Sequence, residues 1–85
     1  MNFFVDWNEN ARNGLASAWI SSSDRNAITK AEAKIDRLLS LDPFSHGEPL
    51  AEGLFAINVP PLRVTHEVSE DEQKVYVVAL AISRP

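Results

Sequence analysis

Side chains that could carry out acid–base chemistry are few in this chain. Its 85 residues include two histidines, His46 and His66, and no cysteine. The usual pKa of histidine lies close to neutral pH, so these two residues are the natural candidates for a general acid or base. The absence of cysteine excludes thiolate catalysis, disulfides and a Cys-ligated metal. There is also no HxxxH or HxxE spacing, and we expect neither a metal site nor a cofactor.

The residues around His66 alternate in character, which predicts a strand over residues 62–68. One face of that strand carries Leu62, Val64, His66 and Val68, and the other carries Arg63, Thr65 and Glu67. Because its own face is otherwise aliphatic, we interpret His66 as a packed residue that faces the helices rather than as a catalytic one. His46 lies in a loop over residues 43–48 that could move.

Two helices are predicted before this strand-rich part of the chain. Residues 3–7 alternate as a short strand, and Asn8 is a suitable N-cap for a helix that starts at Glu9. A polar break at residues 21–24 separates it from a second helix, whose apolar positions follow helical spacing: Ile28, Ala31, Ile35, Leu38 and Leu39. Asp42 ends this second helix because Pro43 follows it. We expect Trp7 and Trp19 to lie in the core.

After residue 43 the hydrophobic period changes to two. Residues 54–59, 62–68 and 75–82 read as strands, separated by a turn at Pro60-Pro61 and a polar hairpin loop at 69–74. The element order is then strand, helix, helix, strand, strand, strand. This order predicts a single α+β domain over residues 1–85, with a twisted, mainly antiparallel sheet and an N-terminal α-hairpin packed on one face.

Charge and hydropathy narrow the range of partners. Twelve acidic residues face eight basic ones, giving a net charge of −4, which counts against nucleic acid as a general ligand. The N-terminus has no basic leader, and the longest apolar run, residues 75–82, has only strand length. We therefore expect a cytoplasmic protein with no membrane contact.

The last third of the chain resembles the RelE/ParE-type toxins, a superfamily of plasmid-stabilisation and type II toxin–antitoxin toxins. Residues 62–68 (Leu-Arg-Val-Thr-His-Glu-Val) resemble the family's strand pattern of aromatic, arginine, two aliphatics, tyrosine, polar and valine. A Val59-Pro60-Pro61 turn stands where the family usually has a valine–glycine turn. Residues 75–83 followed by Arg84 resemble the family's last strand, and residues 28–39 closed by Asp42-Pro43 resemble its second helix.

This resemblance implies the toxin of a prokaryotic toxin–antitoxin pair, in a divergent form. RNA-cleaving members carry basic residues on the second strand, an arginine on the third, another after the last, and often a terminal tyrosine or histidine. Only Arg63 and Arg84 match that catalytic set. Leu54, Ala56 and Asn58 stand where those members often place lysine or arginine, and we expect no terminal tyrosine because only Pro85 follows Arg84.

Metal-independent RNA cleavage activates a 2′-hydroxyl, stabilises a phosphorane and protonates a leaving oxygen. Arg63 and Arg84 could stabilise the phosphorane by bidentate contacts, but arginine is a poor acid or base. The resemblance therefore favours a toxin that binds a target such as DNA gyrase, with weak or no ribosome-dependent cleavage of mRNA. Alternatively, Arg63 belongs to a solvated Arg/Thr/Glu stripe, and the chain is a catalytically inactive protein-interaction module.

The resemblance also implies an antitoxin partner, since antitoxins of this family wrap acidic, partly disordered tails around the toxin. Lys30, Lys34 and Arg37 line one flank of the second helix, while Glu32 and Asp36 line the other. Such a flank is commonly a solvated helix edge. It is also where we expect an acidic antitoxin segment to dock.

Overall fold

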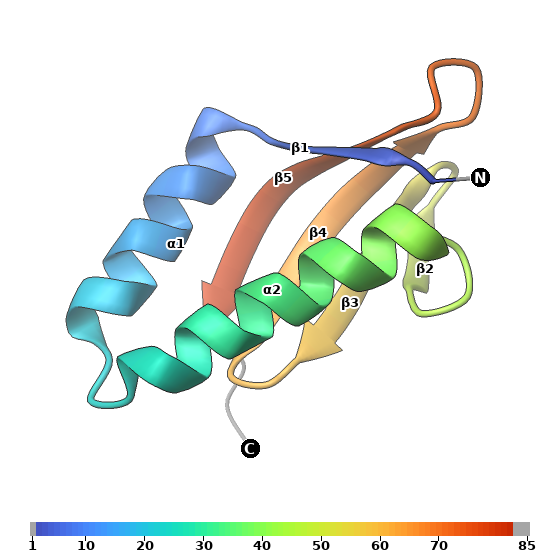
Figure 1. The fold of residues 1–85 in the computed structure, drawn as a ribbon. Helices are drawn as coiled ribbons and strands as arrows, with labels where there is room; N and C mark the ends of the chain where they lie inside the picture. The colour runs from blue at the N-terminus through green and yellow to red at the C-terminus, as the bar shows by residue number, and fades with distance from the viewer. Residues whose placement is uncertain (1, 83–85) are drawn as a thin grey trace.

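The computed structural model describes residues 2–82, which form two helices and one five-stranded sheet (Figure 1). In chain order the elements are β1 (Phe4–Trp7), α1 (Glu9–Ser21), α2 (Arg25–Leu41), β2 (Glu48–Ala51), β3 (Leu54–Val59), β4 (Leu62–Ser69) and β5 (Lys74–Ile82). The predicted α+β class and the order of strand, helix, helix and strands are confirmed. Strand β2 was not predicted and precedes the three expected C-terminal strands.

The sheet is mixed but mainly antiparallel, with strand order β1-β5-β4-β3-β2. Strands β2 to β5 form antiparallel pairs. The N-terminal strand β1 pairs in parallel with the C-terminal strand β5, so the two elements furthest apart in sequence lie side by side. A register irregularity between Thr65 and His66 interrupts the β4–β5 ladder.

Side-chain caps define where the helices begin. Asn8 precedes α1, and its side-chain oxygen accepts a hydrogen bond of 2.8 Å from the backbone N–H of Ala11. Asp24 caps α2 in the same way, accepting from the N–H of Ala27 at 3.1 Å. Each cap satisfies a backbone donor that has no partner within the helix. The break expected at residues 21–24 is thus a short link between two capped helices.

The core lies between the helices and one face of the sheet. The predicted apolar stripe of α2, the five residues at helical spacing, is confirmed. Four of the five are buried, and Leu38 is half-buried and packs against them. They pack against alternate residues of three strands, Ile57, Val59, Leu62, Val64, Val75 and Val77. This packing fixes which sheet face is covered and leaves the opposite face, here called the helix-free face, without a helix.

The two tryptophans differ from each other in burial. Trp7 is half-buried against the core, and its Nε1 donates to Asp36 at 3.2 Å. The prediction for Trp19 was wrong, since 43% of this residue is exposed. Helix α1 packs at the β5 side of the sheet (Figure 1), and Trp19 lies beside the start of α2. There the guanidinium of Arg25 lies 4.6 Å above the indole ring and also donates to the Trp19 carbonyl oxygen at 3.1 Å.

Among the helices of residues 2–82, none is both long enough and apolar enough to cross a membrane.

Candidate functional site

Alternation along β4 separates its two sets of side chains as predicted. Leu62, Val64 and His66 are buried on the helix-covered face. Arg63 lies opposite Asn58, Thr65 opposite Ala56 and Glu67 opposite Leu54, so these six residues share the helix-free face. This part of the helix-free face therefore receives no lysine or arginine from β3, as expected from the sequence.

Arg63 forms an ion pair on the helix-free face, with Glu48 of the unpredicted strand β2. Its Nη2 lies 3.2 Å from Glu48 Oε2, and the two side chains are 38% and 64% exposed. The sequence pointed to Thr65 and Glu67 as the neighbours of Arg63, whereas the carboxylate that contacts it comes from the next strand but one. A guanidinium that already donates to a carboxylate must release it before it can bind phosphate with both of its donor edges.

Arg84, the second arginine of the predicted catalytic pair, lies outside the described residues. Its proximity to Arg63 therefore remains a prediction.

His66 is fully buried, as predicted, and ties a loop to the sheet. Its Nε2 lies 3.1 Å from the carbonyl oxygen of Pro43. Because a carbonyl oxygen can only accept, Nε2 carries the proton and donates it. The other ring nitrogen, Nδ1, has no partner among the described residues. Burial lowers the pKa of His66, and its ring stacks on Phe55 with centroids 5.6 Å apart, so the residue is structural.

Tyr76 is a polar residue of the helix-free face that sequence reasoning did not single out. It pairs with Glu67 on one side and Asp6 on the other, and its hydroxyl donates to Glu72 Oε1 at 2.8 Å. This hydrogen bond and the nearby carboxylates raise the pKa of Tyr76. Glu67, its partner on β4, is four residues from Arg63, which is about 14 Å along a strand. Tyr76 and Arg63 therefore lie at different places along the sheet, and the Tyr76 hydroxyl is already hydrogen-bonded to a carboxylate.

The charges of the helix-free face do not favour RNA. Strand register places Asp6, Glu48 and Glu67 on its described part, together with the cations Arg63 and Lys74. Three carboxylates against two cations give this face no positive surplus, and one cation is already paired. A surface that binds a polyanion needs the opposite balance.

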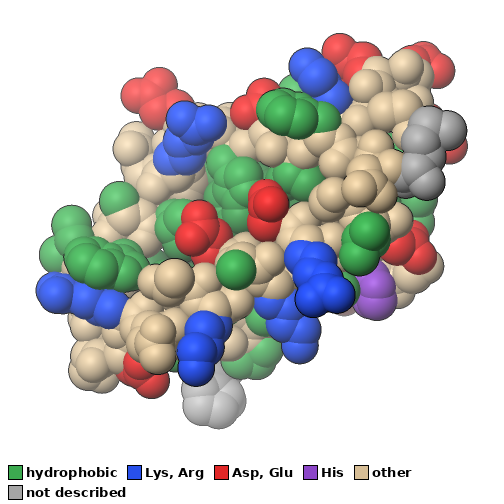
Figure 2. Space-filling model, in the orientation of Figure 1, with side chains coloured by type: hydrophobic (Ala, Val, Ile, Leu, Met, Phe, Trp, Pro, Cys, Tyr) green, Lys and Arg blue, Asp and Glu red, His purple; other side chains and the backbone are tan. Residues whose placement is uncertain are grey.

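Basic residues gather instead on α2. Lys30, Lys34 and Arg37 are exposed there, and none of them forms an ion pair with a described residue. Figure 2 shows lysine and arginine side chains in a row over this helix. Lys34 also lines a hollow of about 350 Å³ between α2 and β3, together with His46 and Asn58. The structure thus places His46 beside the basic flank that the sequence predicted.

No protein-family model matches this sequence, and no curated protein matches it. Solved structures do. A chain of the RelBE2 toxin–antitoxin complex from Mycobacterium tuberculosis is 18% identical, with a TM-score of 0.80 over 96% of this chain and 92% of that one. The isolated Escherichia coli RelE toxin is 16% identical, with a TM-score of 0.64 over 98% and 86%. A chain of the ParDE system of Pseudomonas aeruginosa is 12% identical, with a TM-score of 0.70 over 96% and 97%.

These likenesses confirm that the chain has the RelE/ParE-type toxin fold. The low identities show that the likeness to these three chains is one of fold rather than of sequence.

Proposed function

We propose that this chain is the toxin of a prokaryotic type II toxin–antitoxin pair that acts in the cytoplasm by binding a target, with little or no cleavage of mRNA. The fold supports the toxin part of the proposal, because RelE, RelBE2 and ParDE chains share it over nearly the full length of this chain. DNA gyrase is the target implied by the resemblance to the ParE branch.

The ion pair between Arg63 and Glu48 is the observation that most supports the non-nuclease part. It occupies the one predicted catalytic arginine that the structure describes. His66, the nearest histidine in sequence, is buried on the opposite face, and the Tyr76 hydroxyl donates to Glu72. Cleavage without a metal needs an acid, a base and phosphate-binding cations within hydrogen-bond reach of the same atoms. The described residues do not assemble that set.

The antitoxin is proposed to dock an acidic segment on the basic flank of α2. Lys30, Lys34 and Arg37 are exposed and free of described ion pairs. The hollow beside Lys34 adds apolar contact from Leu38 and Ile57. An acidic, amphipathic segment could thus combine charge pairing with burial of apolar surface.

The test is induced expression in a bacterial host, alone and together with a candidate antitoxin, a small protein with an acidic tail if one is encoded beside this gene. Expression alone should arrest growth, co-expression should restore it, and the two proteins should co-purify. Lys34→Glu should weaken the complex about tenfold, whereas Arg12→Glu, an exposed charge reversal on α1, should leave it unchanged. Normal growth on expression of the chain alone would contradict the toxin proposal, and equal effects of the two variants would contradict the docking surface.

The second candidate is a catalytically inactive interaction module on the same fold. The ion pair between Arg63 and Glu48 supports this module as much as it supports a toxin without nuclease activity. Growth without arrest, combined with a stable complex with the neighbouring protein, would select this alternative. Inhibition of supercoiling by purified DNA gyrase would select the toxin.

A further inference from the structure

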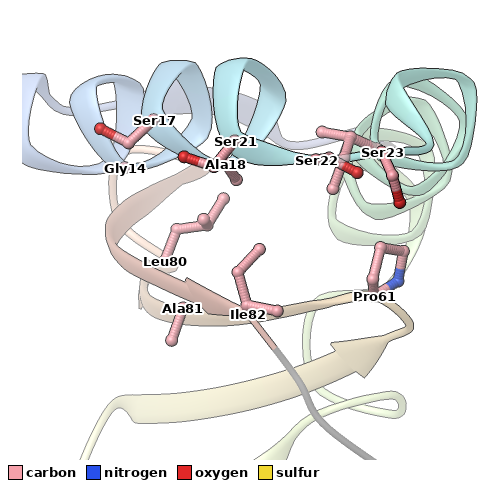
Figure 3. Close-up of a pocket in the computed structure, with 11 residues that line it drawn as sticks. Gly14, Ser17, Ala18, Ser21, Ser22, Ser23, Pro61, Leu80, Ala81 and Ile82 are labelled. Atoms are coloured by element: carbon pink, nitrogen blue, oxygen red, sulfur yellow. The ribbon is translucent and has the colours of Figure 1, made fainter.

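The side of α1 that faces β5 is built from small residues (Figure 3). They are Gly14, Ser17, Ala18 and Ser21. At Gly14 the helix is in contact range of the strand, since an added Cβ would lie 3.3 Å from the Leu80 carbonyl oxygen. Because a helix turns by about 100° per residue, larger residues of α1 lie on the side that faces away from β5. These are Arg12, Trp19 and Ile20.

Trp19 and Ile20 form an exposed apolar projection near the end of α1, here called the Trp19–Ile20 projection. Ile20 is 66% exposed, the highest value among the large hydrophobic residues of the range 2–82. Arg25 holds the projection in place, because its guanidinium covers the Trp19 ring and its Nη2 donates to the Ile20 carbonyl oxygen at 3.4 Å. Apolar side chains that are held in one conformation at the surface lose little entropy when a partner covers them.

Two hollows open between α1 and α2 beside this projection. The first has a volume of about 410 Å³ and extends from the projection to Arg12 and Glu32. The second, of about 550 Å³, shares Arg12 and Glu32 with the first and continues to Trp7 and Asp36. Figure 2 shows hydrophobic and acidic side chains in this region between the two helices. The patch thus has a projection at one end, a hollow at the other, and Arg12 and Glu32 in its middle.

The charges in the middle of the patch have opposite signs. Arg12 stands on the α1 wall and Glu32 on the α2 wall, and neither forms an ion pair within residues 2–82. A partner surface of one sign would be repelled by one of these two residues. A second copy of the chain presents both signs. A two-fold rotation about an axis between the walls brings Arg12 of each copy opposite Glu32 of the other.

The same two-fold rotation matches the two ends of the patch. It carries the Trp19–Ile20 projection of one copy over the second hollow of the other, because these two features lie on opposite sides of Arg12 and Glu32. Trp7 offers an aromatic surface in that hollow. Asp36 offers a charge opposite to that of Arg25, which accompanies the projection. Shape and charge are therefore complementary between two identical patches.

We propose that the chain forms a two-fold symmetric dimer through this patch, with the Trp19–Ile20 projection of each copy in the second hollow of the other. The patch spans two helices of a small chain. We therefore expect an interface near or below the standard size of about 800 Å² per copy, and a dimer that dissociates on dilution. The basic residues Lys30, Lys34 and Arg37 lie on the other flank of α2, so the dimer leaves the proposed antitoxin surface open. The dimer does not depend on the toxin–antitoxin proposal.

Sedimentation velocity of the full-length protein over about 1–300 μM measures the association. The average mass should rise with concentration from that of one chain, 9.4 kDa, toward twice that value. Ile20→Glu places a charge in the apolar contact and should weaken the dimer at least about tenfold. Leu50→Glu is the matched control, because Leu50 is 48% exposed on β2, outside the patch, and should leave association unchanged. Circular dichroism verifies that each variant is folded.

A charge exchange tests the two-fold arrangement itself. Arg12→Glu alone and Glu32→Arg alone each place like charges opposite one another in a homodimer, so each should weaken association. An equal mixture of the two variants should associate again, because every facing pair then has opposite signs. A wild type that stays monomeric at the highest concentration, equal effects of Ile20→Glu and Leu50→Glu, or a mixture that stays monomeric would overturn the dimer. No antitoxin takes part in these measurements, so such results would leave the toxin proposal standing.

Discussion

Arg63 and Glu48 meet on the helix-free face with 3.2 Å between Nη2 and Oε2. Their strands, β4 and β2, are not adjacent, and both side chains reach across β3 at Ala56 and Asn58, which are short residues. The short β3 residues that replace the expected cations therefore also make room for the ion pair. The absence of a cation from β3 and the ion pair of Arg63 with an acid both disfavour phosphate binding at this place.

Glu48→Gln should release Arg63 at little cost in stability. Exposed ion pairs contribute about 0.2–1 kcal/mol, so the free energy of unfolding should fall by less than about 1 kcal/mol in urea melts. Binding of a short RNA oligonucleotide, followed by fluorescence anisotropy, should tighten severalfold. Glu52→Gln removes the same charge from an exposed turn and should not tighten binding. Equal effects of the two variants would show that net charge, and not the Arg63 contact, controls binding.

Ile35→Ala should destabilise the protein by about 2–5 kcal/mol, because it opens a cavity between α2 and the sheet. Ile35 is fully buried, whereas Leu41 at the end of the same helix is 54% exposed. Leu41→Ala should therefore cost less than about 0.5 kcal/mol. Denaturant melts of the two variants test the packing. A small loss for Ile35→Ala would place that helix face in solvent.

Lowering the pH should destabilise the protein through His66. Because its pKa in the folded state lies below the usual value of 6.5, the unfolded chain takes up the proton first. The contribution of His66 to the free energy of unfolding is then fully present above pH 6.5. It is lost as the pH drops from 6.5 through the pKa of the folded state. The urea concentration at the midpoint of unfolding should be lower at pH 5.5 than at pH 8.

His66→Phe is the control for that titration, since it keeps an aromatic ring and removes the titrating group. It should be less stable at pH 8 because the Pro43 carbonyl loses its donor. Its midpoint should, however, change less between the two pH values than that of the wild type. An identical pH dependence in both proteins would assign the effect to other groups.

The sequence predicts the fold well because its periodicities are strong. The apolar stripe of α2 and the parity of residues 62–68 correctly placed Ile35 inside and Arg63 and His66 on opposite faces. Strand β2 was missed because all four of its residues are exposed and one is Pro49, so it has no alternation to detect. Trp19 was assigned to the core from helical spacing, but spacing does not reveal that α1 packs at the β5 side of the sheet.

The candidate site was predicted only in part. The sequence predicted that Leu54, Ala56 and Asn58 replace the basic residues of the RNA-cleaving toxins. This was possible because the Pro60-Pro61 turn determines the register of β3 against β4. The partner of Arg63 could not, since Glu48 lies on the missed strand and 15 positions away. The contact between Tyr76 and Glu72 spans only four residues across the β4–β5 turn. It depends on the conformation of that turn, which a run of polar residues does not specify.

Primer extension on translated mRNA, with purified protein and ribosomes, tests the central claim most directly. Each missing acid, base or phosphate-binding group would ordinarily contribute about 10²–10⁴ in rate, so their combined loss should bring cleavage close to background. We predict no cuts above a ribosome-only control, for wild type and for Arg63→Ala. Cuts at defined codon positions in the wild type that disappear in Arg63→Ala would contradict the account and establish the chain as a ribonuclease.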